Sequence, residues 1–137
     1  MWLVIKKTMN GIPKEYHGAA DFAYVPAVWM APKLAGFEEE QTAATICRVF
    51  STVDLAYTLC TDARWGIVKA IPYKTHAALD VLAGLAAFPI PWIINKSENK
   101  AVRNTFLAMG VIGVVVGTLS LIGGGFEPQR LKGTKDH

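Results

Sequence analysis

The sequence of 137 residues is poor in charge and in cysteine, and each shortage excludes a class of protein. Only 18% of its residues are charged, against 52% that are hydrophobic, and the net charge is +3. No basic stripe interleaves with aromatic residues, so we expect no nucleic-acid partner. The two cysteines, Cys47 and Cys60, lie thirteen residues apart in one apolar run. That spacing suits neither a disulfide within one helix nor a metal or redox motif, and we interpret both as small apolar residues.

The sequence also lacks the motifs of an enzyme and the apolar region of a secretion signal. It contains no nucleophile–base pair, phosphate-binding loop or metal-binding motif, so we predict no catalytic residue and no enzymatic activity. The opening residues, MWLVIKKTMNGIPKEY, have five apolar positions before two lysines, which is too few for a signal peptide. We expect residues 1–11 to lie at a membrane interface, with Trp2 among the lipid headgroups.

The chain is rich instead in long apolar runs. They cover residues 17–35, 42–60, 76–94 and 102–124. A membrane-spanning helix needs roughly 20 mostly apolar residues. The last run is the clearest. Apart from Gly, Thr and Ser, residues 107–121 are all apolar, so a helix there has no polar face. We therefore predict an all-α membrane protein with four transmembrane helices, and a soluble bundle of unusually apolar helices is the alternative.

Two stretches of the chain resemble each other at a spacing of 59 residues, beginning with IPKEYH (12–17) and IPYKTH (71–76). The matched pairs are Ile12 and Ile71, Pro13 and Pro72, His17 and His76, Ala19 and Ala78, Asp21 and Asp80, Ala27 and Ala86, Pro32 and Pro91, and Glu39 and Glu98. Further on, TLCT (58–61) aligns with TLSL (118–121) if one residue is inserted. We predict two tandem helical-hairpin repeats, 12–69 and 70–128, related by pseudo-two-fold symmetry and followed by a polar tail, 129–137.

Positive charges predict the orientation of the expected helices. With four spans, both termini and the central loop share one side of the membrane. That side would hold Lys6, Lys7, Lys14, Arg64, Lys69, Lys74, Arg130, Lys132 and Lys135, and the other side Lys33, Lys96, Lys100 and Arg103. The excess favours a multi-pass protein of a bacterial inner membrane with both termini in the cytoplasm. Tryptophans near both ends of the helices predict an aromatic belt at each interface: Trp2 and Trp65 inside, Trp29 and Trp92 outside.

Ionisable residues inside the expected helices form the candidate functional site. His17 and Asp21, like His76 and Asp80, are four residues apart, so each pair shares one helix face. Tandem hairpins have the same orientation, so the two pairs would lie at one depth, which Asp54 would also reach. Three roles are open: structural pairing, ligation of a haem, pigment or metal by His17 and His76, and a proton or ion relay. We predict no cofactor and no metal, since no haem-attachment motif or dense ligand set accompanies the histidines.

The fourth apolar run carries a stripe of small residues. Gly110, Gly113 and Gly117 follow spacings of three and four and therefore line one helix face. Helices in lipid associate through close packing, which small residues permit. The stripe predicts contact with another helix, either of this chain or of a partner.

Each repeat has the outline H-x-x-x-D, an apolar helix, a proline near its outer end, a short polar loop and a second apolar helix. In this outline, and in the join TDARWGIVKAIPYKTHAALDVLAGLAAFPIPW (61–92), the chain resembles the SPW-repeat family of small bacterial membrane proteins. The family's Ser-Pro-Trp corresponds here to Ile90-Pro91-Trp92 and to Ala31-Pro32-Lys33. The resemblance implies a four-helix integral membrane protein and offers no catalytic residue.

Two functions are open for such a chain. Four short spans leave little interior volume for a substrate path, which favours an accessory subunit of a larger membrane complex, such as a respiratory or photosynthetic electron-transfer complex. Its partners would be the lipid bilayer and other membrane-protein subunits. The alternative is a small oligomeric transporter or channel that uses the His–Asp cluster as a proton or ion relay.

Overall fold

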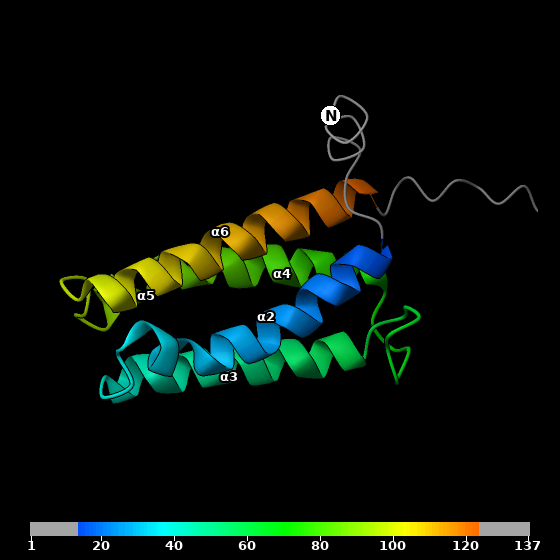
Figure 1. The fold of residues 1–137 in the computed structure, drawn as a ribbon. Coiled ribbons are helices and arrows are strands. Elements are labelled where there is room, and N and C mark those ends of the chain that lie inside the picture. The colour runs from blue at the N-terminus through cyan, green and yellow to red at the C-terminus, as the bar shows by residue number, and fades with distance from the viewer. Residues whose placement is uncertain (1–13, 124–137) are drawn as a thin grey trace, which may run out of the picture.

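The computed structural model describes residues 14–123, and the regular elements in that range are helices (Figure 1). They are α2 (Lys14–Ala35), α3 (Gln41–Leu59), α4 (Tyr73–Ala87), α5 (Ile90–Ile93) and α6 (Lys100–Gly123). The expected interfacial segment 1–11, with Trp2, and the expected tail 129–137 lie outside the described residues.

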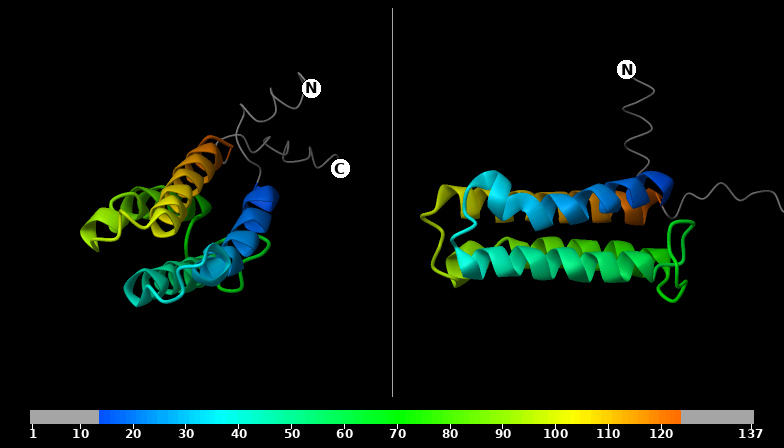
Figure 2. Two further views of the ribbon diagram at one scale, coloured as in Figure 1. Left: turned by 60° about the vertical axis from the view of Figure 1, so that its left-hand side comes forward. Right: turned by 60° about the horizontal axis from the view of Figure 1, so that its bottom comes forward.

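The long helices form two hairpins. Helix α2 packs along α3, and α4 packs along α6, while the hairpins meet mainly through α2 and α6. Figure 2 shows α2 and α6 in one layer and α3 and α4 in the other. The first residues of α2 and α4 and the last residues of α6 therefore lie at the same end of the bundle (Figure 1).

Prolines affect the helices differently in the two hairpins. Helix α2 continues through both Pro26 and Pro32. In the second hairpin the expected helix 76–94 is divided, because α4 ends at Ala87 and α5 begins at Ile90. Pro89 and Pro91 lack the N–H groups that would continue the hydrogen bonds of α4, which accounts for this break.

Among the described residues, α6 is the helix long and apolar enough to cross a membrane by length and composition. Only 28% of its most apolar stretch is buried within the described bundle. Helix α4 has 15 residues, which is short for a span, and α3 carries Arg48 and Asp54. The described chain is thus all-helical with one candidate membrane span.

The two hairpin turns share backbone geometry at a spacing of 59 residues. In each turn an N–H donates to the carbonyl of a proline five residues earlier: Phe37 to Pro32 at 2.8 Å and Lys96 to Pro91 at 2.7 Å. The residue before each donor has a positive φ: Gly36 at 82° and Asn95 at 56°. Glycine and asparagine are the residues that adopt this conformation most readily.

The apolar core fills the half of the bundle nearest these turns. Three pairs of its buried residues lie 59 positions apart: Val28 and Ala87, Ala43 and Val102, and Cys47 and Phe106. Phe37 from the first turn and Met109 from α6 complete the buried cluster. The two hairpins therefore supply this core from matching positions.

The glycine stripe of α6 faces α4 of the same chain. A Cβ atom at Gly113 would lie 2.8 Å from Cα of Gly84, and one at Gly117 would lie 2.8 Å from a carbonyl oxygen of α4. Gly110 lies against the ring of Phe88, just beyond the end of α4. Of the two partners left open by the sequence, the described structure places the helix of this chain against the stripe.

We predict that Gly113→Ala lowers the thermal unfolding midpoint of the purified chain. The new methyl group would force the backbones of α4 and α6 apart, and such overpacking costs about 1–3 kcal/mol. That cost exceeds the gain of about 1 kcal/mol that alanine brings to a helix. Val115→Ala, at an exposed position of α6, is the control and should change the midpoint little. An unchanged or raised midpoint for Gly113→Ala would contradict the tight contact.

An ion pair joins the two hairpin turns at the surface. Nζ of Lys96 lies 2.8 Å from Oε2 of Glu40. The hydrogen bond from Lys96 lowers the pKa of the Glu40 carboxyl. A carboxyl whose pKa is lowered by folding stabilises the folded chain above its unfolded pKa, and this contribution is lost as the pH falls through the folded-state pKa.

Lys96→Met should therefore return the pKa of Glu40 toward its ordinary value, as followed by NMR titration of the carboxyl. It should also remove the part of the fall in stability at low pH that comes from loss of this ion pair. Lys100→Met, which removes a positive charge four residues further along the chain, serves as the control. Equal titration of Glu40 in the wild-type chain and in Lys96→Met would show that the pair does not form in solution.

Candidate functional site

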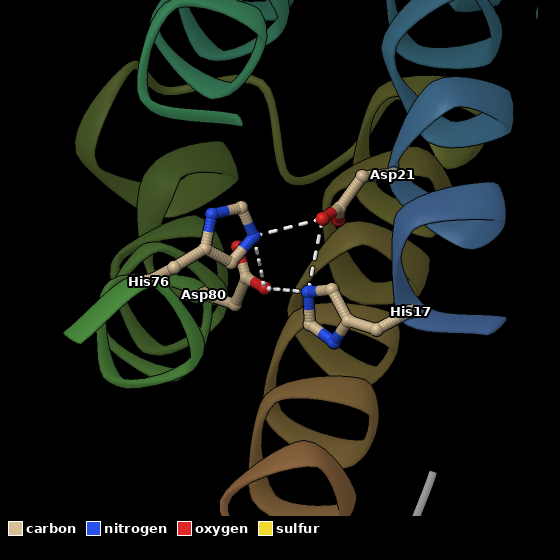
Figure 3. Close-up of side chains that lie close together, drawn as sticks. All are labelled: His17, Asp21, His76 and Asp80. Carbon is tan, nitrogen blue, oxygen red and sulfur yellow. Dashed lines mark hydrogen bonds and ion pairs between the residues drawn. The ribbon is translucent and has the colours of Figure 1, made fainter. Parts of the chain in front are cut away.

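Four ionisable side chains singled out in the sequence come together in the other half of the bundle (Figure 3). His17 and Asp21 come from α2, and His76 and Asp80 come from α4. Each histidine Nε2 faces Oδ2 of both aspartates. The four contacts form a closed ring: His17–Asp21 at 2.9 Å, Asp21–His76 at 2.8 Å, His76–Asp80 at 3.3 Å and Asp80–His17 at 2.9 Å. We call these four residues the His–Asp ring.

The His–Asp ring is buried and links the two hairpins. Both histidines have 0% of their surface exposed, and Asp21 and Asp80 have 5% and 6% exposed. A charged group in such an interior is costly unless it is paired. Each aspartate here contacts one histidine of its own hairpin and one of the other. Neither hairpin could provide this pairing alone, so the ring connects α2 directly to α4.

A hydroxyl group contacts the second nitrogen of each histidine. Oγ1 of Thr61 lies 2.7 Å from Nδ1 of His76, and Oγ of Ser120 contacts Nδ1 of His17. Thr61 and Ser120 are 59 residues apart, and each belongs to the hairpin opposite its histidine. The inserted alignment of TLCT with TLSL pairs Thr61 with Leu121, whereas the structure gives Thr61 and Ser120 equivalent roles without an insertion.

The hydrogen bonds of Thr61 determine the proton position on His76. The Thr61 hydroxyl donates to the carbonyl oxygen of Tyr57 at 2.5 Å, which uses its one proton. Thr61 therefore accepts a hydrogen bond from Nδ1–H of His76. The remaining nitrogen of His76, Nε2, faces two carboxylates, and a bare lone pair there would be repelled. Either a proton, carried by Nε2 or by one of the two carboxyl groups, or a metal ion has to occupy these contacts.

Tyrosine and threonine side chains bind carboxylate oxygens near the ring. The Tyr57 hydroxyl donates to Oδ1 of Asp80 at 2.7 Å, so the Asp80 oxygen outside the ring also has a partner. Asp54, the fifth residue of the cluster expected from the sequence, accepts a hydrogen bond from Oγ1 of Thr58 at 3.0 Å. Asp54 is buried near the ring and is not one of the four residues that form it.

A cavity of about 250 Å³ lies between the two hairpins and reaches the ring. Asp21 and Asp80 line it, together with Asp54 and mainly apolar residues from all four long helices. Its lining includes Val53 and Ile112, whose side chains are 54% and 45% exposed, so the cavity opens at the surface of the bundle. The cavity therefore leads from the side of the bundle to Asp21 and Asp80, whereas the two histidines do not line it.

Trp65 packs over the ring. Its indole lies parallel to the imidazole of His17, at a centroid distance of 6.5 Å and an interplanar angle of 14°, and meets His76 edge-on at 5.5 Å. Any side chain at Gly18 would collide with this indole. Trp65, expected as an interfacial anchor, is thus partly buried against the ring. The other described anchors, Trp29 and Trp92, are 47% and 52% exposed.

Comparisons with protein-family models, with curated proteins and with solved structures find no match for this chain. The resemblance to SPW-repeat proteins stays a prediction, and the roles of the residues rest on the geometry of the site. That geometry allows two kinds of chemistry. Protons can close the His–Asp ring as a structural link, or a metal ion can take their place.

We predict that Thr61→Val destabilises the chain by about 1–3 kcal/mol, because it leaves the buried Nδ1–H of His76 without an acceptor. Valine has nearly the same shape, so the effect reports the hydroxyl rather than the packing. Ser120→Ala should destabilise the chain similarly through His17. Thr52→Val, at an exposed position of α3, is the control. Unfolding by denaturant in detergent measures all three, and a Thr61→Val chain as stable as Thr52→Val would contradict the hydrogen-bond assignment.

Proposed function

We propose that the chain is a four-span membrane protein that serves as a non-catalytic structural subunit of a larger membrane complex. The observation that carries this proposal is the distribution of polar and apolar groups. In water a helical bundle buries apolar side chains and exposes its charged ones. This bundle buries two histidines and three aspartates while large apolar side chains are exposed, among them Leu34, Val49, Leu82, Leu85, Ile93 and Val111. A bilayer accounts for both features, since it solvates apolar surfaces and makes polar groups pair internally.

Helix lengths support four spans. Helices α2, α3 and α6 have 22, 19 and 24 residues, against roughly 20 for a span. Helix α4 is shorter, but α4 and α5 together cover 73–93. Two tandem repeats with pseudo-two-fold symmetry account for the hairpin turns, core pairs and ring hydroxyls that recur at a spacing of 59. Lysine and arginine counts favour both termini in the cytoplasm of a bacterium.

The interior of the bundle supports a structural rather than a transporting role. The apolar core fills one half of it, the His–Asp ring lies in the other half, and the cavity beside the ring has about 250 Å³. The exposed apolar faces would then pack against lipid and against other subunits, such as those of an electron-transfer complex. The resemblance to SPW-repeat proteins is in line with this role.

One observation favours the alternative, a proton or ion relay. Asp54 lines the same cavity as Asp21 and Asp80, so three buried carboxyl groups adjoin one opening. Such groups within spans often mark ion pathways. The purified chain can be placed in liposomes and proton flux into them measured. Flux that requires Asp54 would support the relay. Absence of flux, with the bundle still folded, would support the structural role.

The topology can be tested with reporter fusions in bacterial cells. Fusions after Lys69 and after His137 should give cytoplasmic signals, and a fusion near Glu39 should give a periplasmic signal, because the positive charges keep the first two on the inner side. The reversed pattern would contradict the orientation. Cytoplasmic signals at all three sites, with the protein in the soluble fraction, would contradict four spans.

The subunit role requires a second measurement, on the chain in mild detergent. We expect it to migrate in native gels within an assembly of fixed composition that forms reproducibly from its own membrane. Arg64→Ala, a change in the loop between the hairpins, should leave the assembly intact. Migration as a single chain under conditions that preserve other membrane complexes would contradict the subunit role without affecting the topology.

A further inference from the structure

We propose that the His–Asp ring binds one divalent transition-metal ion, with Zn²⁺ as the best fit. The ligands would be Nε2 of His17, Nε2 of His76 and one carboxylate oxygen each from Asp21 and Asp80. This inference goes beyond the structural role proposed above and does not depend on it. A metal-free ring would still link the hairpins, and a metal-bound ring could function in any assembly.

The geometry of the ring is close to that of a four-coordinate site. One ligand atom from each of the four residues lies within 4.8 Å of the others. Zinc with bonds of about 2.0–2.1 Å to histidine and carboxylate separates tetrahedral ligand atoms by about 3.3 Å. The four contacts of the ring measure 2.8–3.3 Å. Four of the six separations among the ligand atoms are thus within about 0.5 Å of the tetrahedral value. The other two cross the ring and are no longer than 4.8 Å, so binding an ion would require the side chains to adjust around it.

The ring residues also form hydrogen bonds to groups outside the ring, and these bonds are of the kind that orients metal ligands in proteins. A ligating histidine usually donates its other ring N–H to an acceptor, which fixes the tautomer and the orientation of the ring. His76 donates Nδ1–H to Thr61, whose own proton is committed to the carbonyl of Tyr57. Nε2 of His76 is therefore directed into the ring. The Tyr57 hydroxyl binds the outer oxygen of Asp80, which leaves Oδ2 of Asp80 directed inward.

The charge of the site also favours a divalent ion. Two carboxylates and two neutral imidazoles carry a net charge of −2, which a divalent ion neutralises. A neutral cluster is the form best tolerated in a buried apolar setting. Imidazole ligands select Zn²⁺ and its transition-metal neighbours over Mg²⁺ or Ca²⁺, which prefer oxygen ligands. Asp21 and Asp80 line the cavity between the hairpins, which provides a path of entry.

The same geometry favours an ion over a haem or pigment. The imidazole rings of His17 and His76 have centroids 4.9 Å apart and stand nearly perpendicular to each other. Both carboxylates of the ring contact the same two nitrogens. This arrangement leaves room for a single ion among the four side chains and none for a macrocycle between the histidines.

The site can be tested with Co²⁺, which reports its coordination in visible spectra and stands in for Zn²⁺. The full chain, purified in detergent and treated with a chelator, is titrated with Co²⁺. We expect saturation at one Co²⁺ per chain, with the strong ligand-field bands of a four-coordinate site, and loss of the bands when Zn²⁺ is added. Asp80→Asn should weaken Co²⁺ binding by more than tenfold, because it removes a charged ligand.

Two further variants separate ligand loss from misfolding. Tyr57→Phe leaves all four ligands in place and should weaken binding about 10–100-fold, as changes in outer hydrogen bonds do. Asp54→Asn removes a buried carboxyl from the same cavity and should bind Co²⁺ like the wild-type chain. Absence of ligand-field bands in the folded wild-type chain would overturn the proposal. It would also be overturned if Asp54→Asn lost as much affinity as Asp80→Asn, because the ion would then lie elsewhere.

Discussion

Two carboxylates and two imidazoles are buried at one place, and the need to pair them determines the structure around them. An unpaired buried charge costs several kcal/mol, so each of the four side chains requires partners. The ring supplies two ring contacts for every member. The polar atoms of these side chains that point away from the ring need partners among the surrounding residues. Thr61 and Ser120 contact the outer nitrogens, and Tyr57 binds the outer oxygen of Asp80. Gly18 lacks a side chain so that Trp65 can cover the histidines.

This requirement explains why the chain contains two similar hairpins that depend on each other. Each hairpin provides one histidine, one aspartate and one hydroxyl, and in each case the hydroxyl contacts the histidine of the other hairpin. A hairpin alone would leave half of these contacts open. The opposite half of the bundle contains the apolar core, to which the two hairpins contribute residues from equivalent positions, such as Cys47 and Phe106. The bundle therefore has a polar link at one end and an apolar core at the other.

Much of this arrangement can be read from the sequence, because it follows from periodicity. The spacing of 59 and the i, i+4 pairs bring His17, Asp21, His76 and Asp80 to one depth and one face. The all-helical class follows from the apolar runs. Contacts between segments far apart in the chain are harder to read. Thr61 lies in an irregular loop, and its link to His76 depends on how that loop packs. No local ligand motif marks the ring either, since each helix supplies only two of its members.

Cooperation across the ring is the central claim, and a double-mutant cycle between Asp21 and His76 tests it most directly. The variants Asp21→Asn, His76→Gln and the double mutant keep the approximate size of each side chain. Their stabilities are measured by unfolding of the full chain in detergent, at matched metal content. If the ring links the hairpins, the two changes should be strongly non-additive, with a coupling within the range of about 0.5–3 kcal/mol seen for residues in one network. Additive effects of the two substitutions would contradict the account, because they would mean that Asp21 and His76 stabilise the bundle independently.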